Sequence, residues 1–226
     1  MVALSGASAV SHMWQYFTDN RSEIYGWLST TVWLALVPLA VGFAIALPIG
    51  WLASRFRRAY PPIVSLGGLL YTIPSIVLFL ALPGILGTGI LDPVNVAVAL
   101  TLYCIALLVR AVADGLRSVD GAVLDAASAM GYSGRQRFLA VALPLAVPAI
   151  GSGLRVAAVS NVSLVAVAST LGVSQLGSLF TLGNTTGNTA PIWLGLILFV
   201  LLALVIDGLI LVGISLATPW RRAVRR

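Results

Sequence analysis

The chain has 226 residues, of which 59% are hydrophobic and 9% charged, with a formal net charge of +6. A soluble domain carries about 25% charged residues, so this composition excludes a water-soluble globular protein and indicates an integral membrane protein. All 13 basic residues are Arg, which excludes a Lys-dependent phosphate-binding loop, and one Cys (Cys104) with one His (His12) excludes an intrachain disulfide and a Cys/His metal cluster.

The first 26 residues are mixed and polar, without a basic segment followed by an apolar one, so a cleaved signal peptide is not expected. Charge-free runs then predict five membrane helices of about 20 residues or more. Pro74 predicts a kink in the second, whose exit is marked by Pro83-Gly84 and the Gly87-Thr88-Gly89 run. The expected spans are residues 27–52, 63–82, 94–113, 150–171 and 192–216.

The distribution of arginines predicts the orientation of these spans, because cytoplasmic segments carry an excess of basic residues. With the C-terminus inside, the inner segments hold ten arginines and the outer ones only Arg21. We therefore expect an extracytoplasmic segment over residues 1–26, a transmembrane domain over 27–217 and a basic cytoplasmic tail over 218–226.

The segment between the third and fourth spans, residues 115–144, is too polar to cross a membrane. Asp120 is placed to cap a first short helix, and Gly131 to end it in the left-handed conformation. The Ser-x-x-Gln spacing that begins at Ser133 predicts a capping box on a second short helix, which Pro144 is expected to end. An ordinary basic connector that touches lipid headgroups is the alternative to a specific docking element.

This segment resembles the EAA loop of binding-protein-dependent ABC importer permeases, whose form is Glu-Ala-Ala, three residues, Gly, nine residues, Ile-x-Leu-Pro. Every position matches, with Asp in place of Glu and Val in place of Ile, at Asp125, Ala126, Ala127, Gly131, Val141, Leu143 and Pro144. The resemblance implies an all-α permease with a cytoplasmic coupling loop at about 115–144. The loop, including Arg135 and Arg137, would dock on a separate ATPase subunit.

Three further stretches resemble the osmoprotectant subgroup of that family: the run from Thr72 to Gly89, Leu107–Arg110 and Gly153–Ala157. The subgroup imports glycine betaine, choline, carnitine or proline. Leu108 stands where a Pro is usual, and the outer loop lacks the usual Gly-Gly-Gly-Leu run. Amino acids or methionine are the alternative substrates within the family.

The resemblance also implies the surroundings of the chain. They are a cytoplasmic ABC ATPase that uses ATP and Mg, an extracytoplasmic solute-binding protein, and a second permease that is either the same chain or a paralogue. The chain itself is expected to hold no cofactor or metal, to perform no covalent chemistry and to bind no nucleic acid. Its expected location is the bacterial cell membrane, in contact with lipid.

Polar residues at membrane depth are candidates for the translocation path or a gate. Arg110, Arg155 and Asp207 are costly there unless paired, so Asp207 is expected to pair with one of the two arginines as a structural alternative. Small polar residues also hold membrane helices together, which is the alternative for the rest of the set: Tyr71, Thr72, Pro74, Ser75, Asn161 and Ser163.

Two other classes of membrane protein fit less well. A Ser/His intramembrane protease needs a membrane-embedded His, and His12 lies outside every span; an aspartyl type needs two facing aspartates, and Asp114 and Asp207 differ in depth. A secondary transporter is commonly built from inverted repeats, and no internal repeat is visible in this chain.

Overall fold

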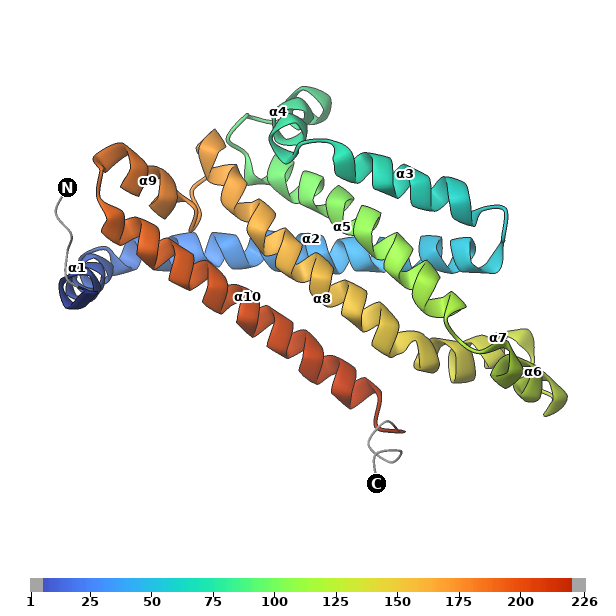
Figure 1. The fold of residues 1–226 in the computed structure, drawn as a ribbon. Coiled ribbons are helices and arrows are strands. Elements are labelled where there is room, and N and C mark those ends of the chain that lie inside the picture. The colour runs from blue at the N-terminus through green and yellow to red at the C-terminus, as the bar shows by residue number, and fades with distance from the viewer. Residues whose placement is uncertain (1–5, 221–226) are drawn as a thin grey trace. The chain divides into compact units, whose positions relative to one another are not determined.

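The computed structural model describes residues 6–220, with side chains from residue 11 onward, and the secondary-structure elements of this part are all helices (Figure 1). A π-helical turn, Phe138–Ala142, precedes α8, and a 3-10 turn, Ala168–Leu171, follows it. Of the predicted tail 218–226, residues 221–226 lie outside the described part. The α-helices are α1 Gly6–Asp19, α2 Arg21–Arg55, α3 Tyr60–Thr72, α4 Ser75–Leu86, α5 Pro93–Arg117, α6 Gly121–Ala129, α7 Gly134–Arg137, α8 Leu143–Val167, α9 Ser178–Thr186 and α10 Thr189–Ala217.

Four helical segments within the described residues are long and apolar enough to cross a membrane: Arg21–Arg55, Pro93–Arg117, Gly134–Leu171 and Thr189–Ala217. The bent pair α3 and α4 supplies a fifth span if both halves belong to one crossing. A multi-pass, all-helical membrane protein is thereby confirmed, with four or five spans. Most of these helices are longer than the predicted apolar runs, because a helix continues past its apolar part where charged ends such as Arg21 and Arg55 reach water.

Prolines change the second predicted span. Pro74 produces a full break between α3 and α4 instead of a kink, because the residue before a proline is disfavoured in the helical conformation; Ile73 is accordingly extended, at φ −67° and ψ 126°. The Tyr103 hydroxyl donates to the Ile73 carbonyl at 2.6 Å. Pro83, predicted at the exit, lies inside α4, and the helix ends at Gly87, whose φ is 69°.

Pro144 does not end the second short helix, so that prediction is wrong. The backbone stays helical from α7 through the π turn Phe138–Ala142 into α8, where Pro144 is the second residue. In the π turn the Leu143 N–H donates to the Phe138 carbonyl, five residues earlier. This wider turn shifts the hydrogen-bond register just before Pro144, which has no N–H to donate, so the helix continues without interruption.

The chain forms two compact units. Unit 1 comprises residues up to Pro38, Pro74–Leu100 and Ser160–Val205, and its core is built around buried apolar side chains that include Phe79, Leu100 and Val165. Unit 2 comprises Leu39–Ile73, Thr101–Val159 and the residues from Ile206 onward, and its core is built around Val112, Leu116, Ala146 and Ile150.

Candidate functional site

The predicted coupling loop lies in unit 2, as the helices α6 and α7 between α5 and α8 (Figure 1). Asp120 caps α6, since its carboxylate accepts a hydrogen bond from the Ala122 N–H at 2.9 Å. Ala127 is 1% exposed and is the buried residue of this helix. Asp120 therefore begins α6 as the sequence predicted.

The turn after α6 depends on Gly131, whose φ of 85° lies in the left-handed region. The Gly131 N–H donates to the Ser128 carbonyl at 3.0 Å, and the Tyr132 N–H donates to the Ala127 carbonyl at 3.1 Å. This pair of bonds is a Schellman motif, which satisfies carbonyls that the helix end leaves without partners. A residue with a side chain adopts this conformation only at a cost, so Gly131 is suited to the sharp change of direction here.

The start of α7 has the predicted capping box. The Ser133 N–H donates to the Gln136 side chain at 2.9 Å, and the Gln136 N–H donates to the Ser133 hydroxyl at 3.4 Å. Arg137 then donates to the Ser128 hydroxyl at 2.6 Å, which ties α7 to the end of α6. The two short helices are thus a locally determined unit whose own hydrogen bonds set its shape.

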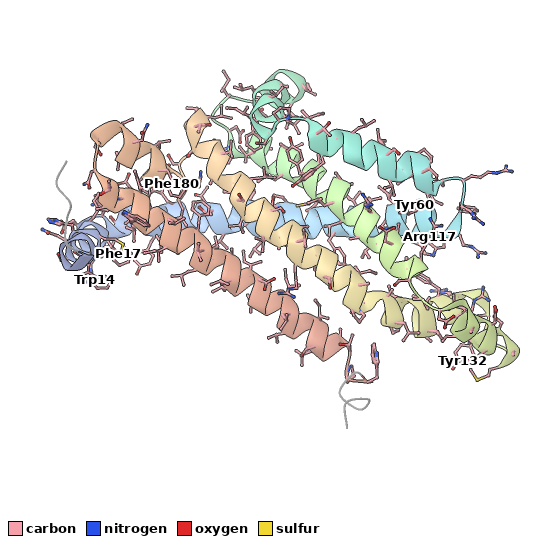
Figure 2. The ribbon with its side chains drawn as sticks, in the orientation of Figure 1. Trp14, Phe17, Tyr60, Arg117, Tyr132 and Phe180 are labelled. Atoms are coloured by element: carbon pink, nitrogen blue, oxygen red, sulfur yellow. The ribbon has the colours of Figure 1, made fainter. Side chains whose placement is uncertain are left out.

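Large apolar side chains point outward on this loop. Met130 is 70% exposed, and Val123 and Leu139 are also exposed. Tyr132, at the turn after α6, is exposed as well (Figure 2). Asp125, Ala126 and Arg135 are exposed as well, while Val141, Leu143 and Pro144 are partly buried where the π turn joins α8. Exposed apolar side chains gathered on a polar loop are typical of a protein–protein contact surface.

Arg155 and Asp207 are the ion pair that the structure brings together at membrane depth. Arg155, on α8, donates from Nε to Oδ1 of Asp207 at 2.6 Å and from Nη2 to Oδ2 at 2.7 Å, and Asp207 lies on α10. Their side chains are 37% and 25% exposed. A bidentate guanidinium–carboxylate pair of this kind is among the stronger and more directional polar contacts, and here it joins two helices of unit 2.

Arg110, the other predicted partner of Asp207, is paired elsewhere. Its Nε lies 3.5 Å from Oδ2 of Asp114, one helical turn later on α5, and both side chains are exposed. Asp114 also accepts a hydrogen bond from the Tyr60 hydroxyl. Arg110 and Asp114 are neighbours on one helix, so their short separation in sequence decides this pairing.

Asn161 lies inside unit 1 and is 1% exposed. Its amide nitrogen donates to the Ala35 carbonyl at 2.7 Å and to the Leu34 carbonyl at 3.4 Å. Pro38 has no N–H, so it cannot bond the Leu34 carbonyl in the usual helical manner. Asn161 supplies that missing donor, which is a structural task inside the helix pair; its Oδ1 has no partner among the described residues.

The remaining predicted path residues fall on both units. Tyr71 and Thr72 are exposed at the end of α3 in unit 2, where Tyr71 packs edge-on against Tyr103 with ring centroids 5.6 Å apart. In unit 1, Pro74 and Ser163 are exposed and Ser75 is partly buried. Tyr103 was not among the predicted residues, although the kink expected at Pro74 indicates that a nearby backbone carbonyl lacks its helical donor.

Comparisons with known proteins agree with this geometry. The family model described as binding-protein-dependent transport system inner membrane component matches residues 42–212. The chain is 30% identical to the osmoprotectant import permease protein OsmW of Salmonella typhimurium, over 86% of this chain and 92% of that protein. It is 26% identical to the choline transport system permease protein OpuBB of Bacillus subtilis, over 92% and 94% of the two chains. It is 31% identical to the glycine betaine/carnitine/choline transport system permease protein OpuCD of the same organism, over 85% and 83%.

Solved structures match in fold. A chain of the MetNI methionine ABC transporter, in an inward-facing conformation, superposes with a TM-score of 0.78 at 22% identity, over 88% of this chain and 98% of that one. A chain of an amino acid ABC transporter superposes with a TM-score of 0.72 at 17% identity, over 89% and 97%.

Proposed function

Because the chain belongs to the family of binding-protein-dependent transport system inner membrane components and is the permease subunit of an ABC importer, we propose that it takes up a small osmoprotectant. Glycine betaine, choline, carnitine and proline are the candidate solutes. The observation that carries this proposal is the agreement among the named relatives, which are osmoprotectant, choline and carnitine permeases matched over most of the chain. The methionine and amino acid transporters resemble the chain in fold alone, so they add no support for their own solutes.

The membrane arrangement that we propose has five spans, with the N-terminus outside and the C-terminus in the cytoplasm. The arginine bias supports the orientation. The count of five is supported by the lengths of α3 and α4, which have 13 and 12 residues; each reaches about 20 Å at 1.5 Å per residue, short of a hydrocarbon core of about 30 Å. The two helices are bent by 97° at the break between them, and we propose that both halves belong to one broken crossing. The domain limits that follow are 1–26, 27–217 and 218–226.

The loop α6–α7 is the proposed docking element for a cytoplasmic ABC ATPase, which would bind ATP and Mg and perform the hydrolysis. The exposed apolar side chains Val123, Met130 and Tyr132 support a protein partner over a bare connector. The Schellman turn and the capping box support a rigid element that transmits movement of the ATPase to α5 and α8. No covalent chemistry and no cofactor are assigned to the permease chain.

The proposed assembly contains a second permease subunit, identical or related, and an extracytoplasmic solute-binding protein that selects the solute. In the most apolar stretch of α10, 11% of the residues are buried within the chain. Most of this apolar helix is therefore left to be covered by something outside the chain. Lipid and a second permease are both expected to cover such a surface. For the path itself we retain Tyr71, Thr72, Ser75 and Ser163, whereas the contacts of Arg155, Asp207 and Asn161 favour structural roles.

Uptake by cells that lack the chain tests the proposed solute class. Radiolabelled glycine betaine, choline, carnitine, proline and methionine are measured in parallel, with the wild-type chain and a Gly131→Asp variant supplied in trans. We expect wild-type protein, and not the variant, to restore uptake of at least one of the first four solutes. Restoration of methionine uptake alone would assign the chain to the amino-acid class and overturn the osmoprotectant proposal.

A further inference from the structure

A groove of ≈ 600 Å³ opens at the end of unit 2 that carries α6 and α7. Four arginines line it, two from the ends of α2 and α5 and two from α7: Arg55, Arg117, Arg135 and Arg137. Its aromatic part is formed by Trp51 and Phe138, whose rings meet edge-on with centroids 6.0 Å apart. A groove with this volume lies in the range of small-molecule binding sites.

Within the part of the chain that the structure describes, the arginines of this groove form no ion pair with a carboxylate. Among residues 11–220, neither of the two ion pairs involves any of the four arginines. Arg117 lies over the Tyr60 ring, with Cζ 4.2 Å from its centroid (Figure 2), and Arg137 donates to the Ser128 hydroxyl. Four guanidinium groups around one groove repel one another, so an anion placed among them is strongly favoured.

A second, apolar cavity of ≈ 270 Å³, called the slot below, adjoins the groove and shares Trp51, Leu116 and Phe138 with it. Its other lining residues are Leu47, Pro48, Val112 and Leu143. Leu47 precedes Arg55 by eight residues on α2, which is about 12 Å at 1.5 Å per residue toward the middle of the span. The polar and apolar compartments are therefore arranged in depth as the headgroup and acyl chains of a lipid are.

We propose that groove and slot together bind one anionic phospholipid of the leaflet on the coupling-loop side. Its phosphate lies among the four arginines, and an acyl chain lies in the apolar slot past Trp51. Basic pockets beside membrane helices accept anionic headgroups in this way. An acidic segment of the ATPase would satisfy the arginines but would leave the slot empty, so the slot favours lipid. The bound lipid joins α2 and α5 to α7, and it thereby steadies the coupling loop against the spans.

The test uses the full chain purified in detergent, alone and with its co-expressed ATPase. Native mass spectrometry counts bound phosphatidylglycerol and phosphatidylcholine of identical acyl chains, with inorganic phosphate and glycerol 3-phosphate as acyl-free anions. Arg55→Gln/Arg117→Gln removes two groove charges from the ends of α2 and α5 and leaves α6 and α7 unchanged. Arg57→Gln/Arg58→Gln is the matched control, because these exposed arginines lie in the turn just after Arg55 and do not line the groove. Leu47→Phe fills the slot and leaves all arginines in place.

Wild-type protein and the control should retain phosphatidylglycerol in preference to phosphatidylcholine. Each lost groove arginine should weaken its binding about fivefold, and Leu47→Phe should weaken lipid binding while leaving phosphate binding unchanged. Equal binding of phosphatidylglycerol, phosphate and glycerol 3-phosphate would overturn the proposal in favour of a simple anion site. Loss of ATPase co-purification from the Arg55/Arg117 variant, with lipid retention unchanged, would overturn it in favour of an acidic protein partner. If Leu47→Phe lowers the yield of folded protein, the arginine pair and its control decide the question.

Discussion

Polar side chains at membrane depth differ in the groups with which they form ion pairs and hydrogen bonds. Asp207 has both carboxylate oxygens engaged by Arg155, whereas Arg110 pairs with Asp114 on its own helix. Asn161 satisfies a carbonyl that Pro38 leaves without a helical donor. Charge or polarity within a span is therefore not by itself a sign of the translocation path, because each of these side chains has a partner that accounts for its position.

Asp207→Asn tests the structural role of the ion pair. The change removes the carboxylate charge and leaves the Arg155 guanidinium without its counter-ion, so folded abundance and uptake should both fall. Arg155→Gln should have the same effect, and the double variant should lose less than the sum of the two single losses. The measurement is size-exclusion chromatography of a fluorescent fusion together with solute uptake.

Arg110→Gln is the control for that prediction, since its side chain is 70% exposed and its partner lies on the same helix. It should change abundance and uptake far less than Asp207→Asn. Additive losses in the Arg155/Asp207 cycle, or full activity of Asp207→Asn, would show that the pair does not hold α8 to α10.

At the scale of elements, the coupling loop combines local caps with a connection to the spans. The Schellman turn at Gly131 and the box at Ser133 and Gln136 form within a few residues. The π turn Phe138–Ala142 then carries the helix directly into α8. A displacement of α7 would therefore be passed to α8 along a continuous helical backbone, as the proposed coupling to an ATPase requires.

Gly131→Asp should abolish coupling and preserve membrane insertion. At a φ of 85° an added side chain costs about 1–2 kcal/mol, and a carboxylate would stand on the proposed docking surface. We expect loss of ATPase co-purification or of solute-stimulated hydrolysis in reconstituted vesicles, together with uptake, at matched permease abundance. Asp125→Ala should be milder, because it leaves the backbone turn unchanged.

Two variants separate strain from charge at this turn. Gly121→Asp places the same side chain on α6, where the backbone is ordinary and the space is open, and it should remain coupled. Gly131→Asn places a side chain of the same size at the left-handed position without the charge, and it should be less damaging than Gly131→Asp. Normal uptake by Gly131→Asp would reduce the loop to a basic connector.

For the whole molecule, the decisive question is whether α3 and α4 cross the membrane as one span. If they do, the N-terminus and the coupling loop lie on opposite sides; if they do not, four spans place both on the same side. The exposed positions Ser22, Ala129 and Asn184 sample the three relevant segments.

Single cysteines at these positions, in a Cys104→Ala background, test the five-span arrangement. Cys104 is buried, so its replacement by the smaller Ala should be tolerated. Ser22→Cys and Asn184→Cys should react with an impermeant thiol reagent in intact cells, and Ala129→Cys only after permeabilisation. Labelling of Ser22→Cys and Ala129→Cys from one side would contradict five spans and support four.

Local chemistry explains which features were predictable from the sequence alone. Apolar runs identified the spanning segments, and caps such as Asp120 and Ser133 identified the short helices, because these depend on residues within one or two turns of each other. Membership of the permease family followed from such a local pattern and is confirmed by the family match over residues 42–212. The choice of Arg155 over Arg110 as the partner of Asp207 required the packing of α8 against α10. The four-arginine groove likewise arises only when α2, α5 and α7 are brought together, since contacts between helices distant in sequence leave no periodic signal along the chain.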